Sequence, residues 1–326
     1  VIQTFQIYNN DSGAPASYAN GTDVAVDRIG ASATVLNGYI YYAGGCSDIS
    51  CSTVTNTTRY ASIGVDGTIG TWNNGGTLPA NRTFGKLLSA GGTLYYAGGQ
   101  STSALSSAVG TVYYTSGISS GNPTWNGSAA TMGIGDSGSG AQTRTQFGAA
   151  TWNNRLYILG GYNSSGTTQS TVYSSPEQSS GGNITGNWTT GGTSPSNTAF
   201  NYARSGLSVV AYANNLYILG GYDGTNYLAD VQYAQIDTDD GSIGSWSYSE
   251  SLPVPIQQGD AFASNGYIYL VGGRTASTTC TPRTLVAPIS GNTSIASGNN
   301  PTGIGAWYQT NSSYSGDRYG NSAVQY

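Results

Sequence analysis

The sequence predicts an all-β protein built from one short unit that recurs along the whole chain. The first observation is a repeated motif: RLYILGGYN at residues 155–163 returns as NLYILGGYD at residues 215–223, with looser copies from Gly38, Gly92 and Gly266. The second is spacing, because the five Gly-Gly pairs follow one another at intervals of 52 to 62 residues. The third is composition: 49 of the 326 residues are Gly, 26 are Tyr and only 8% are charged. Self-similarity at such a period decides the architecture of the whole chain.

Each Gly-Gly pair ends a predicted β-hairpin. The residues just before it, such as YIYYA at 39–43, are apolar at successive positions, which predicts a strand covered on both faces. A turn precedes that strand, and pairs such as Asn37-Gly38 tolerate the positive φ of tight hairpin turns. Before the turn lies another apolar run, as in GLSVVAY at 206–212, so two antiparallel strands are expected. The five pairs are Gly44-Gly45, Gly98-Gly99, Gly160-Gly161, Gly220-Gly221 and Gly272-Gly273.

A second hairpin is predicted downstream of each Gly-Gly pair. After a variable polar loop comes a third strand, for example GTVYYTS at 110–116. A second turn follows, clearest at Asp66-Gly67 and Asp240-Gly241, and then a fourth strand with one tryptophan. The last repeat is longer because of an insertion near residues 288–300. The tryptophans are Trp72, Trp125, Trp188, Trp246 and Trp307.

Four antiparallel strands at a period of about 50 residues describe one blade of a β-propeller. The Gly-Gly pair, with a Tyr and a Trp downstream, resembles the repeat of the kelch family, and the resemblance covers nearly the whole chain. It implies a radial propeller in which the first strand of each blade lines a central channel. It also implies that most tyrosines and tryptophans pack between blades, where each buries a large area.

The repeats predict a single β-propeller domain over residues 1–326, with an incomplete sixth blade built from the two termini. The sequence IQTF at 2–5 resembles the tryptophan strand with Phe5 in place of Trp, and RYGNSAVQY at 318–326 resembles a first strand. The middle two strands of this blade have no counterpart, so 1–27 and 318–326 are expected to form a shared or truncated blade. The five complete four-stranded blades are expected at 28–81, 82–143, 144–203, 204–255 and 256–317.

Arginine recurs at one position of the repeat. Four arginines lie 16 residues before the first Gly of a pair, and Arg318 holds the matching place near the end of the chain. The fifth repeat has Ile256 there and carries Arg274 directly after its Gly-Gly pair. Because the first two strands are antiparallel, the start of one lies beside the end of the other. Residues at the arginine position and just after Gly-Gly are therefore expected on one propeller face, around the channel mouth.

Two interpretations of this arginine ring stay open. As a binding site, it would offer planar donor groups to a carboxylate, sulfate or phosphate beside aromatic side chains, which is the role that the kelch resemblance implies. As a brace, each arginine would bridge to the neighbouring blade through backbone carbonyls or acids such as Asp27 and Asp317. The variable loops after Gly-Gly, such as 162–169 and 222–228, are a second candidate surface. The candidate ligand-binding residues are Arg28, Arg82, Arg144, Arg204, Arg274, Arg318, Gln100, Tyr162 and Tyr222.

Charge and cysteine content limit the partners and the compartment. The formal charge is −5 with one lysine and no basic cluster, which excludes a nucleic-acid binder, and no apolar run approaches the length of a membrane span. Cys46 and Cys51 lie in one short loop, CSDISC, which predicts a local disulfide and an oxidising compartment. Two unlinked thiols in a cytosolic loop are the alternative, and Cys280 has no evident partner. No signal peptide is visible and the chain starts at Val1, so a mature or trimmed product is expected.

An enzymatic role is not expected. The chain has no histidine, which excludes a Ser-His-Asp or Cys-His mechanism and a His-ligated metal. A sialidase-like glycoside hydrolase is a weaker alternative, because Asp27, Asp260 and Asp317 are expected near the arginine ring. Residues 237–241 resemble a calcium loop, but equivalent repeats carry VDG or SGG there, so a hairpin turn is expected. We expect no metal and no cofactor.

The sequence therefore favours an extracellular or cell-surface module for binding or adhesion, which recognises a glycan or protein ligand through one propeller face. The alternative is a structural subunit of a surface layer or an extracellular filament. Low charge suits that role, and so do strands at both chain ends, because an unpaired strand can complete a blade in the next molecule.

Overall fold

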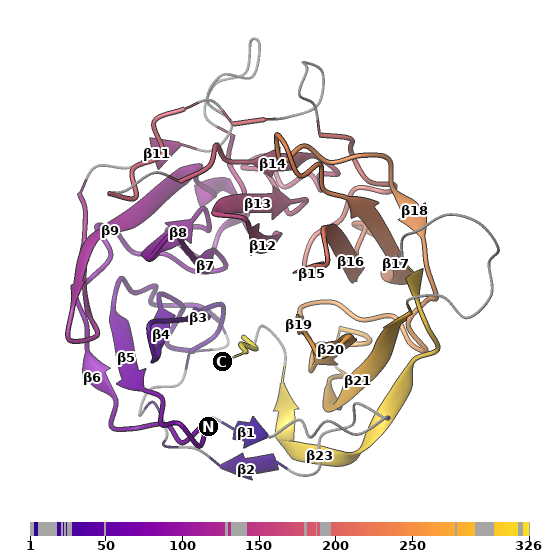
Figure 1. Cartoon of the computed structure of the whole chain (residues 1–326), viewed down its shortest axis with the longest axis horizontal. Helices are drawn as coiled ribbons and strands as arrows, with labels where there is room; N and C mark the ends of the chain where they lie inside the picture. The colour runs from indigo at the N-terminus through magenta and orange to yellow at the C-terminus, as the bar shows by residue number, and fades with distance from the viewer. Residues whose placement is uncertain are drawn as a thin grey trace.

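Antiparallel sheets stand side by side around a central axis, and the chain passes through them in sequence order (Figure 1). Five of these sheets are propeller blades, numbered 1 to 5 in chain order, which confirms the predicted all-β propeller. The computed structural model describes residues 3–5, 18–20, 22, 24, 28–48, 50–127, 130–131, 142–178, 181–186, 188–189, 197–277, 279–290, 303–318 and 322–325.

The strands of each blade follow one another from the channel outward. Blade 1 contains β3 (Ser32–Leu36), β4 (Tyr39–Ala43), β5 (Thr58–Ser62) and β6 (Asn73–Asn74). Blade 2 contains β7 (Lys86–Ala90), β8 (Thr93–Ala97), β9 (Thr111–Ser119) and β10 (Asn122–Trp125), and β11 (Ala130–Thr131) also pairs with β9. Blade 3 contains β12 (Gly148–Trp152), β13 (Arg155–Leu159) and β14 (Val172–Ser174). Blade 4 contains β15 (Ser208–Tyr212), β16 (Asn215–Tyr222), β17 (Tyr227–Gln235) and β18 (Ser247–Tyr248). Blade 5 contains β19 (Asp260–Ser264), β20 (Tyr267–Val271), β21 (Thr281–Ser290), β22 (Gly303–Ile304) and β23 (Tyr308–Arg318).

The fourth strands are short and differ between blades. Blade 3 has a single bridge between Ser174 and Thr189 at this place, and Trp188 beside it is buried. In three blades the indole Nε1 of the tryptophan donates a hydrogen bond to a backbone carbonyl about 50 residues earlier in the chain. These bonds run from Trp72 to Thr22, from Trp246 to Thr198 and from Trp307 to Glu250, at 2.9, 2.8 and 3.0 Å.

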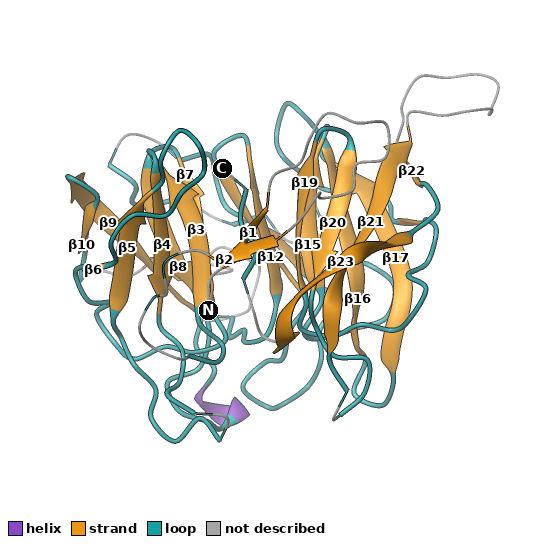
Figure 2. Cartoon of the chain, turned by 90° about the horizontal axis from the view of Figure 1, so that it is seen from below, coloured by secondary structure: helices purple, strands orange, loops and turns teal. Residues whose placement is uncertain are grey.

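The two ends of the propeller have different connections (Figure 2). One end, which we call the turn face, carries the hairpin turns between first and second strands, where Asn37 and Gly38 have φ of 51° and 78°. This confirms the predicted left-handed turns. The other end, which we call the loop face, carries the Gly-Gly pairs and the polar loops that follow them. A short 3-10 helix, η1 (Leu105–Ser107), lies in the loop of blade 2.

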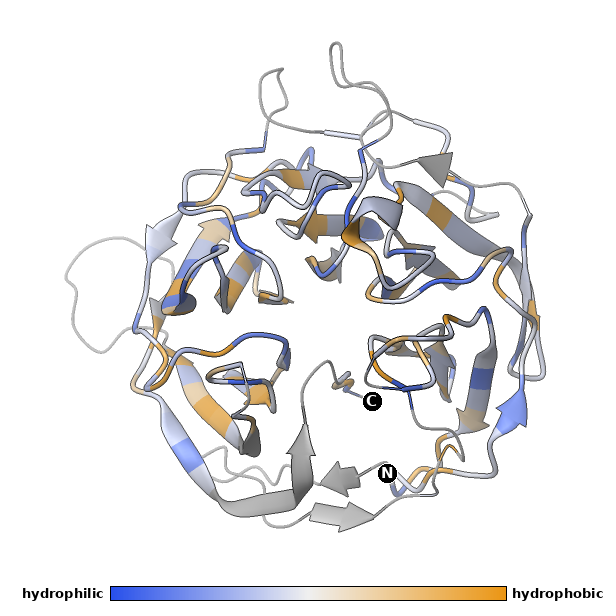
Figure 3. Ribbon diagram, turned by 180° about the vertical axis from the view of Figure 1, so that it is seen from behind, coloured by the Kyte–Doolittle hydropathy of each residue, from blue (hydrophilic) through white to orange (hydrophobic). Residues whose placement is uncertain are grey.

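The hydrophobic core lies between neighbouring blades rather than in one central mass, and Figure 3 shows the hydrophobic positions within the sheets. One cluster joins Tyr95 and Tyr114 of blade 2 to Leu156 and Tyr173 of blade 3. Buried tyrosines recur at equivalent places in the other clusters, which agrees with the expected packing role of most aromatic residues.

First strands from all five blades line the central channel, together with residues 323–325 of the terminal segment. This segment lies between blades 1 and 5, since Ala33 donates to Ser322 and Ala323 donates to Asp260. At the other end of the chain, β1 (Gln3–Phe5) pairs with β2 (Tyr18–Asn20) beside β23 (Figure 1). Residues 6–17 and 319–321 lie outside the described residues, so a sixth blade shared by the termini stays a prediction. The insertion expected near 288–300 falls largely outside them too.

Candidate functional site

A small three-stranded ribbon forms the loop face of each blade. The residue directly after Gly-Gly, which we call the post-glycine residue, is the middle of the ribbon. On one side it pairs with the residue that follows the arginine position, and on the other with the returning chain. In blade 2, for example, Gln100 bridges Thr83 and Ala108. The post-glycine residues are Cys46, Gln100, Tyr162, Tyr222 and Arg274. The predicted proximity of the two positions is thus confirmed at the level of the backbone.

The Gly-Gly pairs lock each blade to the next. The second glycine donates its N–H to the carbonyl of the arginine position in the following blade, as from Gly45 to Arg82 at 2.8 Å. A Cβ on Gly44 would lie 2.5 Å from that same carbonyl oxygen, so the close approach requires glycine. The same bond joins Gly99 to Arg144, Gly161 to Arg204 and Gly221 to Ile256, each at 2.8 Å.

Two of the recurrent arginines are buried braces within their own blades. Arg82 and Arg144 are 5% and 2% exposed. Arg82 donates to the hydroxyls of Thr111 and Tyr113 at 3.0 and 2.8 Å. Arg144 makes the same contacts with Thr171 and Tyr173 at 2.8 and 3.0 Å. In both cases the guanidinium carbon also lies 5.1 Å from the centre of the tyrosine ring, within cation–π range.

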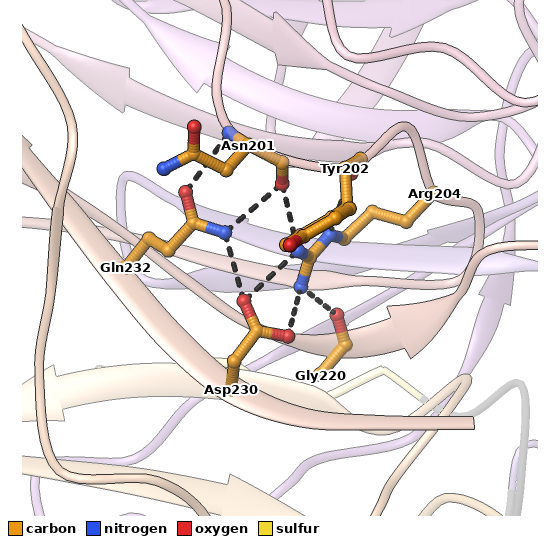
Figure 4. A network of polar contacts seen from close by, with 6 residues as sticks. All are labelled: Asn201, Tyr202, Arg204, Gly220, Asp230 and Gln232. Carbon is orange, nitrogen blue, oxygen red and sulfur yellow. Dashed lines mark hydrogen bonds and ion pairs between the residues drawn. The ribbon is translucent and has the colours of Figure 1, made fainter. Parts of the chain in front are cut away.

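Arg204 is the third buried arginine, and blade 4 satisfies it with an acid (Figure 4). Its Nη1 and Nη2 atoms donate to Oδ1 and Oδ2 of Asp230 at 2.8 and 2.9 Å. The backbone carbonyls of Asn201, Tyr202 and Gly220 accept its remaining bonds.

The predicted open ring of guanidinium groups is therefore wrong for Arg82, Arg144 and Arg204. The competing brace interpretation describes them better, but with different partners. The expected partners were backbone carbonyls of a neighbouring blade or acids such as Asp27 and Asp317. The side chains instead reach the third strand of their own blade, while their backbone groups make the contacts between blades.

The remaining predicted arginines lie in different surroundings. Arg28 is half-buried and donates from Nη2 to the hydroxyl of Thr57 at 3.0 Å. Arg274 is also half-buried and donates from Nε and Nη2 to Oε1 of Gln258, at 3.1 and 2.6 Å. Gln258 in turn donates to Gln146 at 3.1 Å. Arg318 ends β23, paired with Thr281, and its side chain lies outside the described part of the structure.

The post-glycine side chains divide the loop face into a covered part and an open part. Cys46 and Gln100 are buried, and Gln100 accepts a hydrogen bond from Thr145 of the next blade at 2.9 Å. Gln100 is therefore a contact between blades, contrary to its predicted place in an open ligand site. Tyr162 and Tyr222 are half-buried, and the Tyr222 ring lies 5.3 Å from that of Tyr227.

An open ring of backbone hydrogen bonds lines the channel near the loop face. Five residues, each two positions after the arginine position, have left-handed φ angles between 50° and 65°. The series is Gly30, Phe84, Gln146, Gly206 and Gln258. The N–H groups of the last four each donate to the carbonyl of the counterpart in the preceding blade, at 2.7, 3.0, 2.6 and 2.7 Å. The same backbone conformation and the same bond in successive blades are an architectural feature of the propeller.

On the other side of this ring, the channel holds a cavity of about 280 Å³. Lys86 of blade 2 and Asp260 of blade 5 extend into it and form an ion pair at 3.4 Å. Asp260 also accepts from the N–H of Ala323 at 2.8 Å. Asp260 was expected near the arginine ring, but the structure places it inside the channel.

The disulfide prediction is confirmed. Cys46 and Cys51 are joined, and Cys46 lies 3.0 Å from the hydroxyl of Thr83 in the next blade. Cys280 pairs through its backbone with Arg274. The 237–241 stretch forms a turn in which Gly241 donates to the carbonyl of Asp237. Within the described residues, no group of three His, Cys, Asp or Glu side chains lies close enough to hold a metal ion, and no helix is long and apolar enough to cross a bilayer.

Sequence reasoning missed one residue next to the arginine positions. Arg59 of blade 1 stands where blades 2 and 3 have Tyr113 and Tyr173, so it faces the arginine position of its own blade. A signal was present, because TTRYA at 57–61 aligns with TVYYT at 111–115. Alignment of the third strands shows an arginine in place of the usual tyrosine.

Fold and site together define a β-propeller with a three-stranded ribbon at the loop face of each blade. Residues 143–174 and 203–233 match the kelch motif, and these two segments run from the arginine position to the third strand in blades 3 and 4. Alpha-scruin from Limulus polyphemus is 29% identical over 144 residues, which cover 44% of this chain and 15% of alpha-scruin. The solved structure described as "Structure of YjhT" has a TM-score of 0.61 at 12% identity, covering 81% of this chain and 82% of that one, which is a likeness of fold.

Together these findings support a kelch-repeat β-propeller. The matched segment is a small part of alpha-scruin, so activity and partners do not transfer with the match. A β-propeller with kelch motifs suggests a module that binds proteins.

Proposed function

We propose that this protein is an extracellular, non-catalytic module that binds a protein partner through the loop face of blades 3 to 5. The observation that carries the proposal is the contrast between post-glycine side chains on one shared backbone scaffold. Over blades 1 and 2 they are buried, whereas Tyr162, Tyr222 and Arg274 over blades 3 to 5 reach the surface. A rigid scaffold with variable side chains on one face suits partner recognition.

Tyrosine is the main side chain of this surface. Tyr202 is 69% exposed at the entry to blade 4 and has a left-handed φ of 61°. Its backbone carbonyl accepts from Arg204, so the buried ion pair holds the loop that presents the ring. Tyr222 and Tyr227 pack on each other nearby. Rigid aromatic side chains with a hydroxyl are enriched where proteins bind partners, because they bury area at little cost in conformational entropy.

Three observations support the remaining parts of the proposal. The Cys46–Cys51 disulfide suits an oxidising compartment, and hence an extracellular location. The absence of histidine from the sequence suits a non-catalytic role. The burial of Arg82, Arg144 and Arg204 weighs against a sialidase-like site, since those guanidinium groups are already occupied.

A photo-crosslinking experiment tests the proposed surface. A photoreactive phenylalanine derivative placed at Tyr222 should crosslink to a protein from the extracellular medium or cell surface of the source organism. The same group at Val65, which is fully exposed in a turn on the turn face, should not. The captured partner should then bind a Tyr162→Ser, Tyr222→Ser double variant at least about tenfold more weakly, as expected for aromatic hot spots. Equal binding by that variant would refute the surface, and a response only on a glycan array would replace the protein partner by a carbohydrate.

Assembly through the sixth position is a second candidate function. Within the described residues, β1 and β2 pair only with each other, and residues 322–325 form no strand. A strand from a neighbouring molecule could therefore complete this blade. Light scattering of the native particle tests this: a mass near 33.5 kDa argues against assembly, and an open-ended series of masses supports it.

A further inference from the structure

Two facing positions compensate each other in four of the five blades. One is the arginine position, and the other is the third-strand residue opposite it. Blades 2 and 3 place a tyrosine hydroxyl on the arginine. Blade 4 uses an acid and an amide, Asp230 and Gln232. Blade 5 replaces both partners by apolar residues, since Ile256 and Leu285 lie in one hydrophobic cluster. The guanidinium groups of blades 2 to 4 thus each donate to a side chain of their own third strand, although the Nε atoms of Arg82 and Arg144 are buried without a partner.

Blade 1 breaks this rule, because Arg59 stands opposite Arg28. Arg28 donates to Thr57, the counterpart of the threonines that Arg82 and Arg144 contact. Thr57 directly precedes β5 and lies two positions before Arg59, so in the extended chain both side chains point to the same side of the sheet. Burial is the main cause that lowers the pKa of Arg28; the nearby Tyr42 raises this pKa, and the positive charge of Arg59 lowers it. Two like charges are therefore held together where the other blades hold complementary groups.

The described part of the structure provides no counter-charge for these two guanidinium groups. Its ion pairs include Lys86 with Asp260 and Arg204 with Asp230, and neither Arg28 nor Arg59 takes part in one. The Nε of Arg59 is buried and has no hydrogen-bond partner, and the same is true of Arg82 and Arg144, whose terminal nitrogens nevertheless donate to tyrosine hydroxyls. Two neighbouring guanidinium groups without a counter-charge point to an anion that binds from outside the chain.

We propose that Arg28 and Arg59 form a binding site for a carboxylate on the side of blade 1 that faces the sixth position. The Arg204–Asp230 pair of blade 4 shows how a carboxylate binds an arginine at the equivalent position. Asp230 occupies in blade 4 the place of Thr57, and its two oxygens meet the two terminal nitrogens of Arg204. In blade 1 the carboxylate belongs to the ligand, and Arg59 supplies a second set of donors.

The position of the site follows from the packing of the equivalent residues. Tyr113 of blade 2 packs in a cluster with Tyr41 of blade 1, so this third-strand position faces the preceding blade. Arg59 accordingly faces the sixth position, where Trp72 of the same blade donates to Thr22 near the start of the chain. This place is separate from the loop face of blades 3 to 5, so the site and the proposed function stand or fall independently.

The test uses the Nε–Hε signals of arginine in a two-dimensional ¹H–¹⁵N NMR spectrum of the intact protein. The chain has nine arginines, so the spectrum is small enough to assign with single variants. Sodium acetate is titrated against sodium chloride at equal ionic strength. The signals of Arg28 and Arg59 should shift and saturate with acetate alone, whereas the buried Arg82, Arg144 and Arg204 stay unchanged. Equal shifts in both salts, or no shift at Arg28 and Arg59, overturns the proposal.

Arg59→Tyr is the matched variant, because it recreates the arginine–tyrosine pair of blades 2 and 3. It should keep or raise the melting temperature and weaken acetate binding by about tenfold or more, the loss expected for a charge-assisted contact. Arg28→Lys, which keeps the charge and loses the planar fork, should also weaken binding. Unchanged acetate affinity in both variants refutes the site. Tighter binding of sulfate or phosphate than of acetate refutes the assignment to a carboxylate.

Discussion

Arg204 and Asp230 form a two-point ion pair whose positive partner is fully buried and whose negative partner is 21% exposed. The Nη1–Oδ1 and Nη2–Oδ2 distances are 2.8 and 2.9 Å, the parallel geometry that arginine and carboxylate favour. Gln232 donates to both Asp230 and the carbonyl of Asn201, which closes the network (Figure 4). The pair therefore connects the third strand of blade 4 to the loop that carries Tyr202.

Removal of the acid should destabilise the fold. Asp230→Ala leaves a buried guanidinium without its counter-charge, and such a loss costs about 3 kcal/mol in the free energy of unfolding. Urea denaturation followed by circular dichroism measures this. Glu250→Ala is the control, because that side chain is exposed, and it should change the free energy of unfolding by less than about 0.5 kcal/mol. Equal effects of the two substitutions would show that Arg204 does not depend on Asp230.

Arg204 should also be stabilised by the threonine–tyrosine pair that blades 2 and 3 use in place of Asp230 and Gln232. The double variant Asp230→Thr, Gln232→Tyr places at Arg204 the threonine and tyrosine that Arg82 and Arg144 contact. We expect it to recover most of the stability lost in Asp230→Ala, again by urea denaturation. A double variant no more stable than Asp230→Ala would mean that the partners are not interchangeable between blades.

Alanine substitutions at two glycines of blade 1 should distinguish the cost of a left-handed φ angle from the cost of a steric clash between blades. Gly38 and Gly44 have similar left-handed φ angles of 78° and 71°. A Cβ on Gly38 meets nothing within 4 Å, whereas one on Gly44 meets the carbonyl of Arg82. Gly38→Ala should therefore cost about 1 kcal/mol and Gly44→Ala about 3 kcal/mol in the free energy of unfolding. Equal costs in chemical denaturation would show that the contact between blades is relaxed easily.

The fold was predictable because the same repeat occurs five times in the sequence. Each turn, Gly-Gly pair and tryptophan recurs at a matching place, so errors in one copy are corrected by the others. The antiparallel pairing of the first two strands also predicted correctly that the arginine position and the post-glycine residue lie side by side, as Thr83 and Gln100 show for the adjacent pair.

The direction of the arginine side chains was not predictable in the same way. Register fixes the place of a Cα, but the depth of Arg82 or Arg144 depends on whether the third strand provides acceptors under it. For Arg82 that information lies 29 and 31 residues further on, in Thr111 and Tyr113. The covariation between the two positions was visible only when the partners were known, and Arg59 was missed for that reason.

Buried tyrosines should make the propeller sensitive to alkali. Burial raises the pKa of Tyr41 and Tyr95 from the usual 10.0 to about 12. Because the folded state holds these protons more tightly, the stability contributed by neutral tyrosine is present below pH 10 and is lost as the pH rises from 10 to 12. Phenolate absorbance should therefore increase together with the loss of circular dichroism.

Tyr41→Phe is the control for the alkaline transition. The Tyr41 hydroxyl is buried and has no hydrogen-bond partner, so its removal should leave the stability at neutral pH unchanged or raise it. The variant should also unfold at a higher pH than the wild type. Full titration of the phenolates near pH 10 with unchanged circular dichroism would contradict this account.

The position of residues 322–325 between blades 5 and 1 should depend on Asp260. This carboxylate holds both Lys86 across the channel and the N–H of Ala323 in the terminal segment, at 3.4 and 2.8 Å. If the hydrogen bond fixes the segment, Asp260→Ala should speed amide exchange at Ala323 by about tenfold or more, as expected for loss of a charged acceptor. Lys86→Met should leave that amide protected, because the carboxylate remains in place. Equal exchange in the two variants would instead mean that the ion pair positions Asp260, and that the single lysine of the chain is what holds the segment against the channel wall.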